Sequence, residues 1–182
     1  MPVARTRAAL AAVIAPALLL SGLAPAQAAV TVVRDGDDTT IDADIHRVRV
    51  VHNGDLVVRV KLDRLRRTDR PVIQGMNVYV DLRARHRGPE VMVEAGLWRG
   101  ADHVVTKAHR WTRHGYIDCT STLKVSARKD LAVLRLDGSC LPGAHSRARV
   151  AVTTYERARS DDRYESDWLG ERHSFTPWVA RG

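Results

Sequence analysis

The segment between Val91 and Trp111 carries the residue types best suited to binding a ligand. Two runs of alternating apolar residues, Val91–Trp98 and His103–Trp111, flank Arg99-Gly100-Ala101-Asp102, a composition typical of a turn. We therefore predict a hairpin in which Trp98 pairs with His103 and Glu94 with Lys107. Its apolar face would then carry Val91, Val93, Ala95, Leu97, Val104 and Ala108, and its opposite face Met92, Glu94, Trp98, His103, Val105, Lys107 and His109.

On this mixed face, Glu94, Trp98, His103 and Lys107 are the candidate ligand-binding residues. An aromatic ring beside a carboxylate and a cation suits a sugar, which offers an apolar ring face and hydroxyl groups. The alternative is that the C-terminal segment Phe175–Trp178 covers the face. Glu94 and Lys107 would then form an ordinary cross-strand pair.

Five aspartates near residue 40 could bind a metal: Asp35, Asp37, Asp38, Asp42 and Asp44. Clustered carboxylates suit Ca²⁺, which takes about 6–8 oxygen ligands. Their spacing differs from that of an EF-hand loop, so we favour a solvated loop and keep calcium as the alternative.

Histidines give no comparable pattern for a metal site. His103 and His109 share a strand face but lie about 20 Å apart along an extended strand, too far to bind one ion. We expect these side chains, and that of His114, at the surface, and we expect no metal ligands and no cofactor.

No familiar catalytic motif of a serine hydrolase, zinc protease or phosphate-binding loop is found. An enzyme would have to use carboxylates, for which Asp81 and Glu90, on either side of residues 83–88, are the candidates. The simpler interpretation is that Asp81 ends one strand and Glu90 begins the next.

Strands must position all of these residues. Apolar side chains recur at every second position, with turn residues about every 8–12 residues, which predicts an all-β fold. We predict a single antiparallel β-sandwich of about eight to ten strands over residues 29–182. Besides the two runs above and a short one from Val30, the clearest runs are Ile45–Val51, Asp55–Leu62, Met76–Leu82, Asp118–Ala127, Leu131–Asp137 and Arg147–Tyr155, whereas Leu65–Pro71, Arg83–Pro89 and Glu156–Arg172 read as loops.

Two further hairpins can be registered from their apolar faces. A three-residue loop, His52-Asn53-Gly54, would pair Val50 with Leu56 and put the valines of both strands on one side. A two-residue turn at Lys129-Asp130 would bring Cys119 opposite Cys140.

The N-terminus predicts export. Arg5 and Arg7 precede an apolar run, and Ala26-Gln27-Ala28 resembles a signal-peptidase site, so we expect residues 1–28 to be a cleaved signal peptide and the protein to be extracellular. A retained membrane anchor is the alternative. Export to an oxidising compartment in turn favours a Cys119–Cys140 disulfide.

The charge of the chain does not single out a partner. Without residues 1–28 the chain has 27 basic and 21 acidic residues, a net charge of +6. The basic residues are interleaved with acidic ones, whereas nucleic-acid binding usually needs a clustered basic face. We expect no nucleic-acid partner.

Several short motifs together carry a resemblance. They are Asp42-Ala43-Asp44-Ile45, Val78-Tyr79-Val80-Asp81 followed by Gly88-Pro89-Glu90, Ser139-Cys140-Leu141-Pro142-Gly143, and Pro177-Trp178-Val179. In these the chain resembles uncharacterised small secreted β-sandwich proteins of actinobacteria. The architecture is similar to carbohydrate-binding and DOMON-like sandwiches, but neither sugar-stacking aromatics nor haem ligands match residue by residue.

These observations predict a secreted, non-catalytic binding or envelope-associated module whose ligand is a cell-wall or extracellular polysaccharide. A secreted carboxylate-dependent hydrolase and a structural or partner-inhibiting extracellular protein are the alternatives.

Overall fold

Alternating apolar and polar side chains build strands that bury one face. The computed structural model describes residues 29–67, 72–143, 145–158 and 163–182; the predicted signal peptide lies outside them. No α-helix is found in these ranges. The strands are β1 (Ala29–Arg34), β2 (Ile45–His52), β3 (Leu56–Leu62), β4 (Val72–Asp81), β5 (Val91–Gly96), β6 (His103–His109), β7 (Thr112–Tyr116), β8 (Ser121–Ser126), β9 (Leu131–Leu136), β10 (Arg147–Ala158), β11 (Glu165–Trp168) and β12 (Val179–Ala180), with one 3₁₀ turn, Gly138–Cys140.

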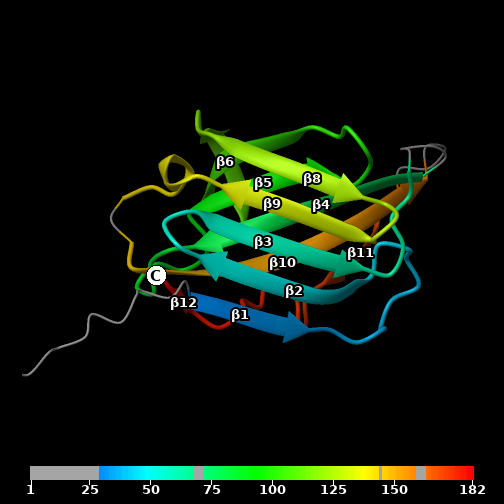
Figure 1. Ribbon diagram of the computed structural model, residues 1–182, viewed down its shortest axis with the longest axis horizontal. Helices are drawn as coiled ribbons and strands as arrows, with labels where there is room; N and C mark the ends of the chain where they lie inside the picture. Colours follow the sequence, from blue (N-terminus) through cyan, green and yellow to red (C-terminus); the bar gives the residue numbers. More distant parts are fainter. Residues whose placement is uncertain (1–28, 68–71, 144, 159–162) are drawn as a thin grey trace, which may run out of the picture.

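The strands form two antiparallel sheets that lie face to face, which confirms the predicted β-sandwich (Figure 1). The five-stranded sheet has the order β1-β2-β3-β9-β8. The seven-stranded sheet has the order β11-β10-β4-β5-β6-β7, and β12 pairs with β10. Strands far apart in sequence thus become neighbours, because β10 lies between β4 and β11.

The core lies between the sheets and consists mainly of valine and leucine. Val58 and Val60 of β3 and Val78 and Val80 of β4 all belong to this core and are fully buried. Every second residue of each central strand points outward instead. The outward residues of the seven-stranded sheet are the ones available for function.

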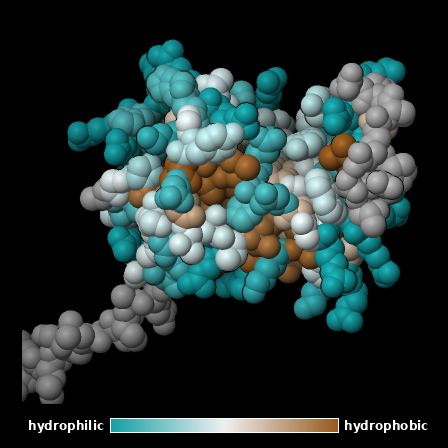
Figure 2. Space-filling view, turned by 90° about the horizontal axis from the view of Figure 1, so that it is seen from above, coloured by the Kyte–Doolittle hydropathy of each residue, from teal (hydrophilic) through white to brown (hydrophobic). Residues whose placement is uncertain are grey.

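One side of the sandwich is less completely closed. Figure 2 looks onto the side that carries β6 and β8 in Figure 1, and hydrophobic surface is visible there between hydrophilic side chains. Ile117, Leu123 and Val125 pack against the core but are only partly buried. These residues precede or belong to β8, the edge strand of the five-stranded sheet.

The β2–β3 and β8–β9 hairpins have the predicted faces, but their registers are shifted by two residues. Val50 pairs with Val58 rather than Leu56, and the loop is Asn53-Gly54-Asp55. Leu123 pairs with Leu134, whereas the predicted two-residue turn at Lys129-Asp130 would have paired it with Leu136, so the turn is longer than predicted. A shift of two residues leaves every side chain on its face, so the burial pattern alone could not detect it.

The disulfide between Cys119 and Cys140 is present, with the two Cα atoms 5.1 Å apart. The register of β8 and β9 does not by itself align these residues. The 3₁₀ turn Gly138–Cys140, which begins where Asp137 accepts a hydrogen bond from the Ser139 amide, brings Cys140 back toward Cys119.

Three strands appear where none was predicted. β7 and β12 are short, and β11 lies inside residues 156–172, for which the sequence predicts a loop. Its residues Glu165–Trp168 are polar apart from the last one, and pairing with β10 makes them a strand. The described residues therefore contain twelve strands, more than predicted.

Candidate functional site

The predicted ligand-binding residues are divided between the two faces of the seven-stranded sheet. β6 pairs with β5 three residues away from the predicted register, so Glu94 faces Val104 and Lys107 faces Val91. When the register shifts by an odd number of residues, the side chains of one strand change to the opposite face of the sheet relative to those of its neighbour. Because Val104 and Val105 are adjacent, the sequence could not say which one points inward, and the structure buries Val105 in the core.

Glu94 and Trp98 lie on the outer face, as predicted, while His103 and Lys107 do not. The His103 ring points toward the other sheet, and its Nε2 lies 2.8 Å from Ser121 Oγ of β8. Lys107 is exposed on β6 and pairs with His114 of β7. The structure therefore does not gather Glu94, Trp98, His103 and Lys107 into one site.

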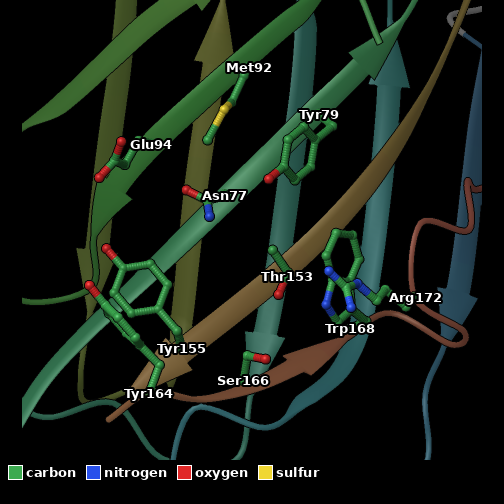
Figure 3. Close-up of a pocket in the computed structure, with 10 residues that line it drawn as sticks. All are labelled: Asn77, Tyr79, Met92, Glu94, Thr153, Tyr155, Tyr164, Ser166, Trp168 and Arg172. Atoms are coloured by element: carbon green, nitrogen blue, oxygen red, sulfur yellow. The ribbon is translucent and has the colours of Figure 1, made fainter. Parts of the chain in front are cut away.

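A hollow on the outer face of the seven-stranded sheet is the candidate site instead. Its volume is about 570 Å³, which lies within the usual range for ligand-binding pockets. We call it the aromatic hollow. It is lined from β4, β5, β10, β11 and the segments beside β11 by Asn77, Tyr79, Met92, Glu94, Thr153, Tyr155, Tyr164, Ser166, Trp168 and Arg172 (Figure 3).

Aromatic rings occupy both ends of the aromatic hollow. At one end, Tyr155 and Tyr164 meet edge to face, with ring centroids 5.9 Å apart. At the other end, the rings of Tyr79 and Trp168 are parallel, with an interplanar angle of 9°. Figure 3 shows the two pairs on opposite sides of the opening, with Asn77 and Thr153 between them. The four rings come from three separate parts of the chain.

A second group of aromatic side chains packs against Tyr79 and Trp168. Trp111 lies 5.0 Å from Tyr79, and Phe175 lies 4.9 Å from Trp111, measured between ring centroids. Together with Met92 they form a small apolar cluster on the outer face. Phe175 of the C-terminal segment thus packs against the cluster at one end of this face, while the aromatic hollow stays open.

Two glycines allow rings to lie flat on the sheet. Gly75 and Gly96 face each other on β4 and β5. A Cβ added to Gly75 would overlap the Tyr155 ring, and one added to Gly96 would lie 2.5 Å from the Trp98 ring. Both rings therefore need the space that a side chain would take. Trp98 covers Gly96 outside the aromatic hollow and does not line it.

Polar groups lie between the rings. Asn77 Oδ1 is buried and has no hydrogen-bond partner among the described residues. Glu94 is half-exposed and pairs with Arg113 Nη1 at 3.3 Å. Burial, together with the Glu94 carboxylate, raises the pKa of both Tyr79 and Tyr155. Their hydroxyls therefore remain protonated at neutral pH and can donate hydrogen bonds.

Sequence reasoning missed most of these residues. In β4, Asn77 and Tyr79 alternate with buried valines, and this pattern could have placed them on the outer face. Thr153 and Tyr155 alternate with buried residues of β10 in the same way. Trp168 gave no such signal because its strand depends on pairing with β10. Only the topology brings β11 beside these strands.

The predicted acidic cluster is partly assembled. Asp38 and Asp44 lie close to Asp167 of β11, with one carboxylate oxygen of each within 4.8 Å of the others. Burial raises the pKa of Asp167 to about 6, and the like charges of Asp44, Asp35 and Asp38 add to this shift. Asp42 instead pairs with Arg64 and Arg66.

Asp81 and Glu90 have structural partners. The fully buried Asp81 carboxylate accepts hydrogen bonds from the Arg83 amide and from Arg149 Nε, at 3.0 and 2.8 Å. Glu90 accepts one from the Leu82 amide at 2.8 Å, and burial raises its pKa. Both carboxylates thus hold the ends of strands and loops in place.

A scan against protein-family models finds no match, and a search of curated proteins finds no significant match. In the part of the chain that the structure describes, no helix is long and apolar enough to cross a membrane.

Proposed function

We propose that this protein is a secreted, non-catalytic binding module that holds a polysaccharide in the aromatic hollow. The observation that carries the proposal is the pairing of aromatic rings at both ends of an open 570 Å³ hollow with polar groups between them. Carbohydrate rings have apolar faces that stack on aromatic side chains and hydroxyls that need hydrogen-bond partners.

The exposure of the rings supports binding of an extended chain. Tyr164 is 65% exposed, although a tyrosine ring normally packs against the protein. It meets Tyr155 at one end, while the Tyr79–Trp168 pair lies at the other. A ligand with successive sugar rings can contact both aromatic pairs at once. A single small molecule would need only one of the two pairs.

The polar lining supplies both donors and acceptors. Ser166 and the hydroxyls of the three tyrosines can donate or accept, Glu94 accepts, and Arg172 donates. Thr153 Oγ1 donates to the Asp167 carbonyl at 2.6 Å and can still accept. The buried Asn77 Oδ1 has no partner among the described residues, so a ligand hydroxyl that reaches it would satisfy it. This arrangement favours a neutral polyhydroxylated ligand over one with a large net charge.

The hydrolase alternative receives less support from the geometry. Asp81 is fully buried and forms an ion pair with Arg149, and both candidate carboxylates hold backbone amides. A carboxylate that accepts protein hydrogen bonds on both oxygens is poorly placed to transfer a proton to a substrate.

The test is retention of the purified protein on insoluble polysaccharides: cellulose, chitin, starch and cell-wall material. The informative pair of variants is Tyr164→Ala and Tyr116→Ala. Both tyrosines are highly exposed, at 65% and 74%, but only Tyr164 lines the hollow. We expect Tyr164→Ala to weaken binding about tenfold, which corresponds to about 1.4 kcal/mol, and Tyr116→Ala to leave it unchanged.

Thermal unfolding of both variants serves as the control, and their midpoints should match that of the wild-type protein. Failure to retain the wild-type protein on any of the four materials would overturn the proposal, as would an equal loss in the two variants. Release of reducing sugar during the assay would favour the hydrolase instead.

A further inference from the structure

The end of the sandwich next to β11 brings three carboxylates close together. Asp38 lies in the loop between β1 and β2, Asp44 directly precedes β2, and Asp167 lies on the inward side of β11. None of the three forms an ion pair with a basic side chain among the described residues. Asp44 and Asp167 are nonetheless 1% and 3% exposed.

Burying charged groups without partners is costly, so a structure usually pairs them or binds a metal to them. Asp167 Oδ2 accepts a hydrogen bond from the Ile45 amide at 2.8 Å, and Asp44 Oδ1 accepts one from Thr39 Oγ1 at 2.7 Å. Asp44 Oδ2 is buried and has no partner among the described residues. This oxygen is therefore free to bind an ion.

The spacing of the oxygens fits a calcium ion. Two oxygens bound to the same Ca²⁺, each about 2.3–2.6 Å from it, lie at most about 5 Å apart. The three carboxylate oxygens lie within 4.8 Å of one another. Because all three are hard oxygen donors, with no His or Cys among them, they favour Ca²⁺ over Zn²⁺.

We propose that Asp38, Asp44 and Asp167 form a calcium site that fastens β11 and the β1–β2 loop to the sandwich. The ion would join segments that only a few hydrogen bonds now connect, among them Gly170 N to Asp35 Oδ2 at 2.9 Å and Ile45 N to Asp167 Oδ2. Since Ser166 and Trp168 on either side of Asp167 line the aromatic hollow, the same ion would hold one wall of the hollow in place. The calcium site itself does not depend on the identity of the ligand bound there.

The experiment measures Ca²⁺ binding to the purified protein by isothermal titration calorimetry, with Mg²⁺ titrated separately. Calcium-dependent thermal unfolding is followed in parallel, and no polysaccharide is present in either assay. The variants are Asp38→Asn and Asp44→Asn. Asp37→Asn is the matched control, because Asp37 is an exposed neighbour in the same loop that does not belong to the cluster.

We expect the wild-type protein to bind one Ca²⁺ per chain more tightly than Mg²⁺ and to unfold at a higher temperature when calcium is present. Asp38→Asn and Asp44→Asn should each weaken calcium binding by about tenfold or more, because affinity depends on the number of charged ligands. Asp37→Asn should bind calcium normally.

The Asp44→Asn variant distinguishes loss of the calcium site from loss of folding. Removing one of three repelling charges, two of which are buried, should raise the unfolding temperature of the metal-free protein, while calcium should no longer raise it further. The proposal is overturned if millimolar calcium gives no binding heat and no stabilisation of the folded wild-type protein. It is also overturned if Asp37→Asn loses as much affinity as Asp38→Asn, which would indicate unspecific attraction to an acidic loop.

Discussion

The ring of Tyr155 occupies the space above Gly75 in which any other residue would place its side chain. The two residues face each other across β10 and β4, so the ring lies flat over the neighbouring strand. This contact sets the position of one wall of the aromatic hollow and leads to the first prediction.

Replacing Gly75 with alanine should displace the Tyr155 ring, because the new methyl group would overlap it. We expect weaker polysaccharide retention, by about tenfold (about 1.4 kcal/mol). Overpacking should also cost about 1–3 kcal/mol of unfolding free energy. Gly36→Ala is the control, since a Cβ there meets nothing within 4 Å. Unchanged retention in Gly75→Ala would contradict this role of Tyr155.

Replacing Trp98 with alanine should lower stability without affecting binding. The indole covers Gly96, outside the aromatic hollow. Losing this half-buried ring should cost about 2 kcal/mol. Thermal midpoint and polysaccharide retention are measured on the same preparation. Lost retention at an unchanged midpoint would instead assign Trp98 to the binding site.

The metal-free protein should become more stable on mild acidification. The pKa of Asp167 is about 6 in the folded protein, above its ordinary value of 3.8, so the folded state binds the proton more tightly than the unfolded chain. The resulting stabilisation is fully present below pH 3.8 and is lost as the pH rises through about 6.

In EDTA, the unfolding free energy of the wild-type protein should therefore increase between pH 7 and pH 5 by about 1 kcal/mol more than that of Asp167→Asn. Urea unfolding at the two pH values measures the difference. Equal pH dependence in the two proteins would show that Asp167 does not titrate in this range.

Replacing both Cys119 and Cys140 with alanine should lower the free energy of unfolding by about 2–4 kcal/mol, because the bridge closes a loop and restricts the unfolded chain. Their sequence separation is 21 residues. The far-UV circular dichroism spectrum should keep its β-sheet shape, and urea unfolding gives the change in stability. Titration of free thiols in the folded wild-type protein should find none, and finding two would refute the bridge.

The sequence by itself determined the fold class, the disulfide partners and which residues share a face within a strand. Alternation with a period of two separates Met92 and Glu94 from the buried Val91 and Val93, and the structure confirms this separation. The chain has two cysteines, so each has only the other as a partner within the chain. These features depend on local pattern or on simple counting.

Only the tertiary structure decided how the strands are placed beside one another. A register shift of two residues leaves all faces unchanged, and the adjacent Val104 and Val105 gave β6 two equivalent orientations. Asp167 and Trp168 became functional candidates because β10 pairs with β11. This pairing brings Asp167 beside Ile45, 122 positions earlier in the chain, and Trp168 beside Tyr79. Such long-range pairing depends on the packing of the two whole sheets, which no local pattern of side chains encodes.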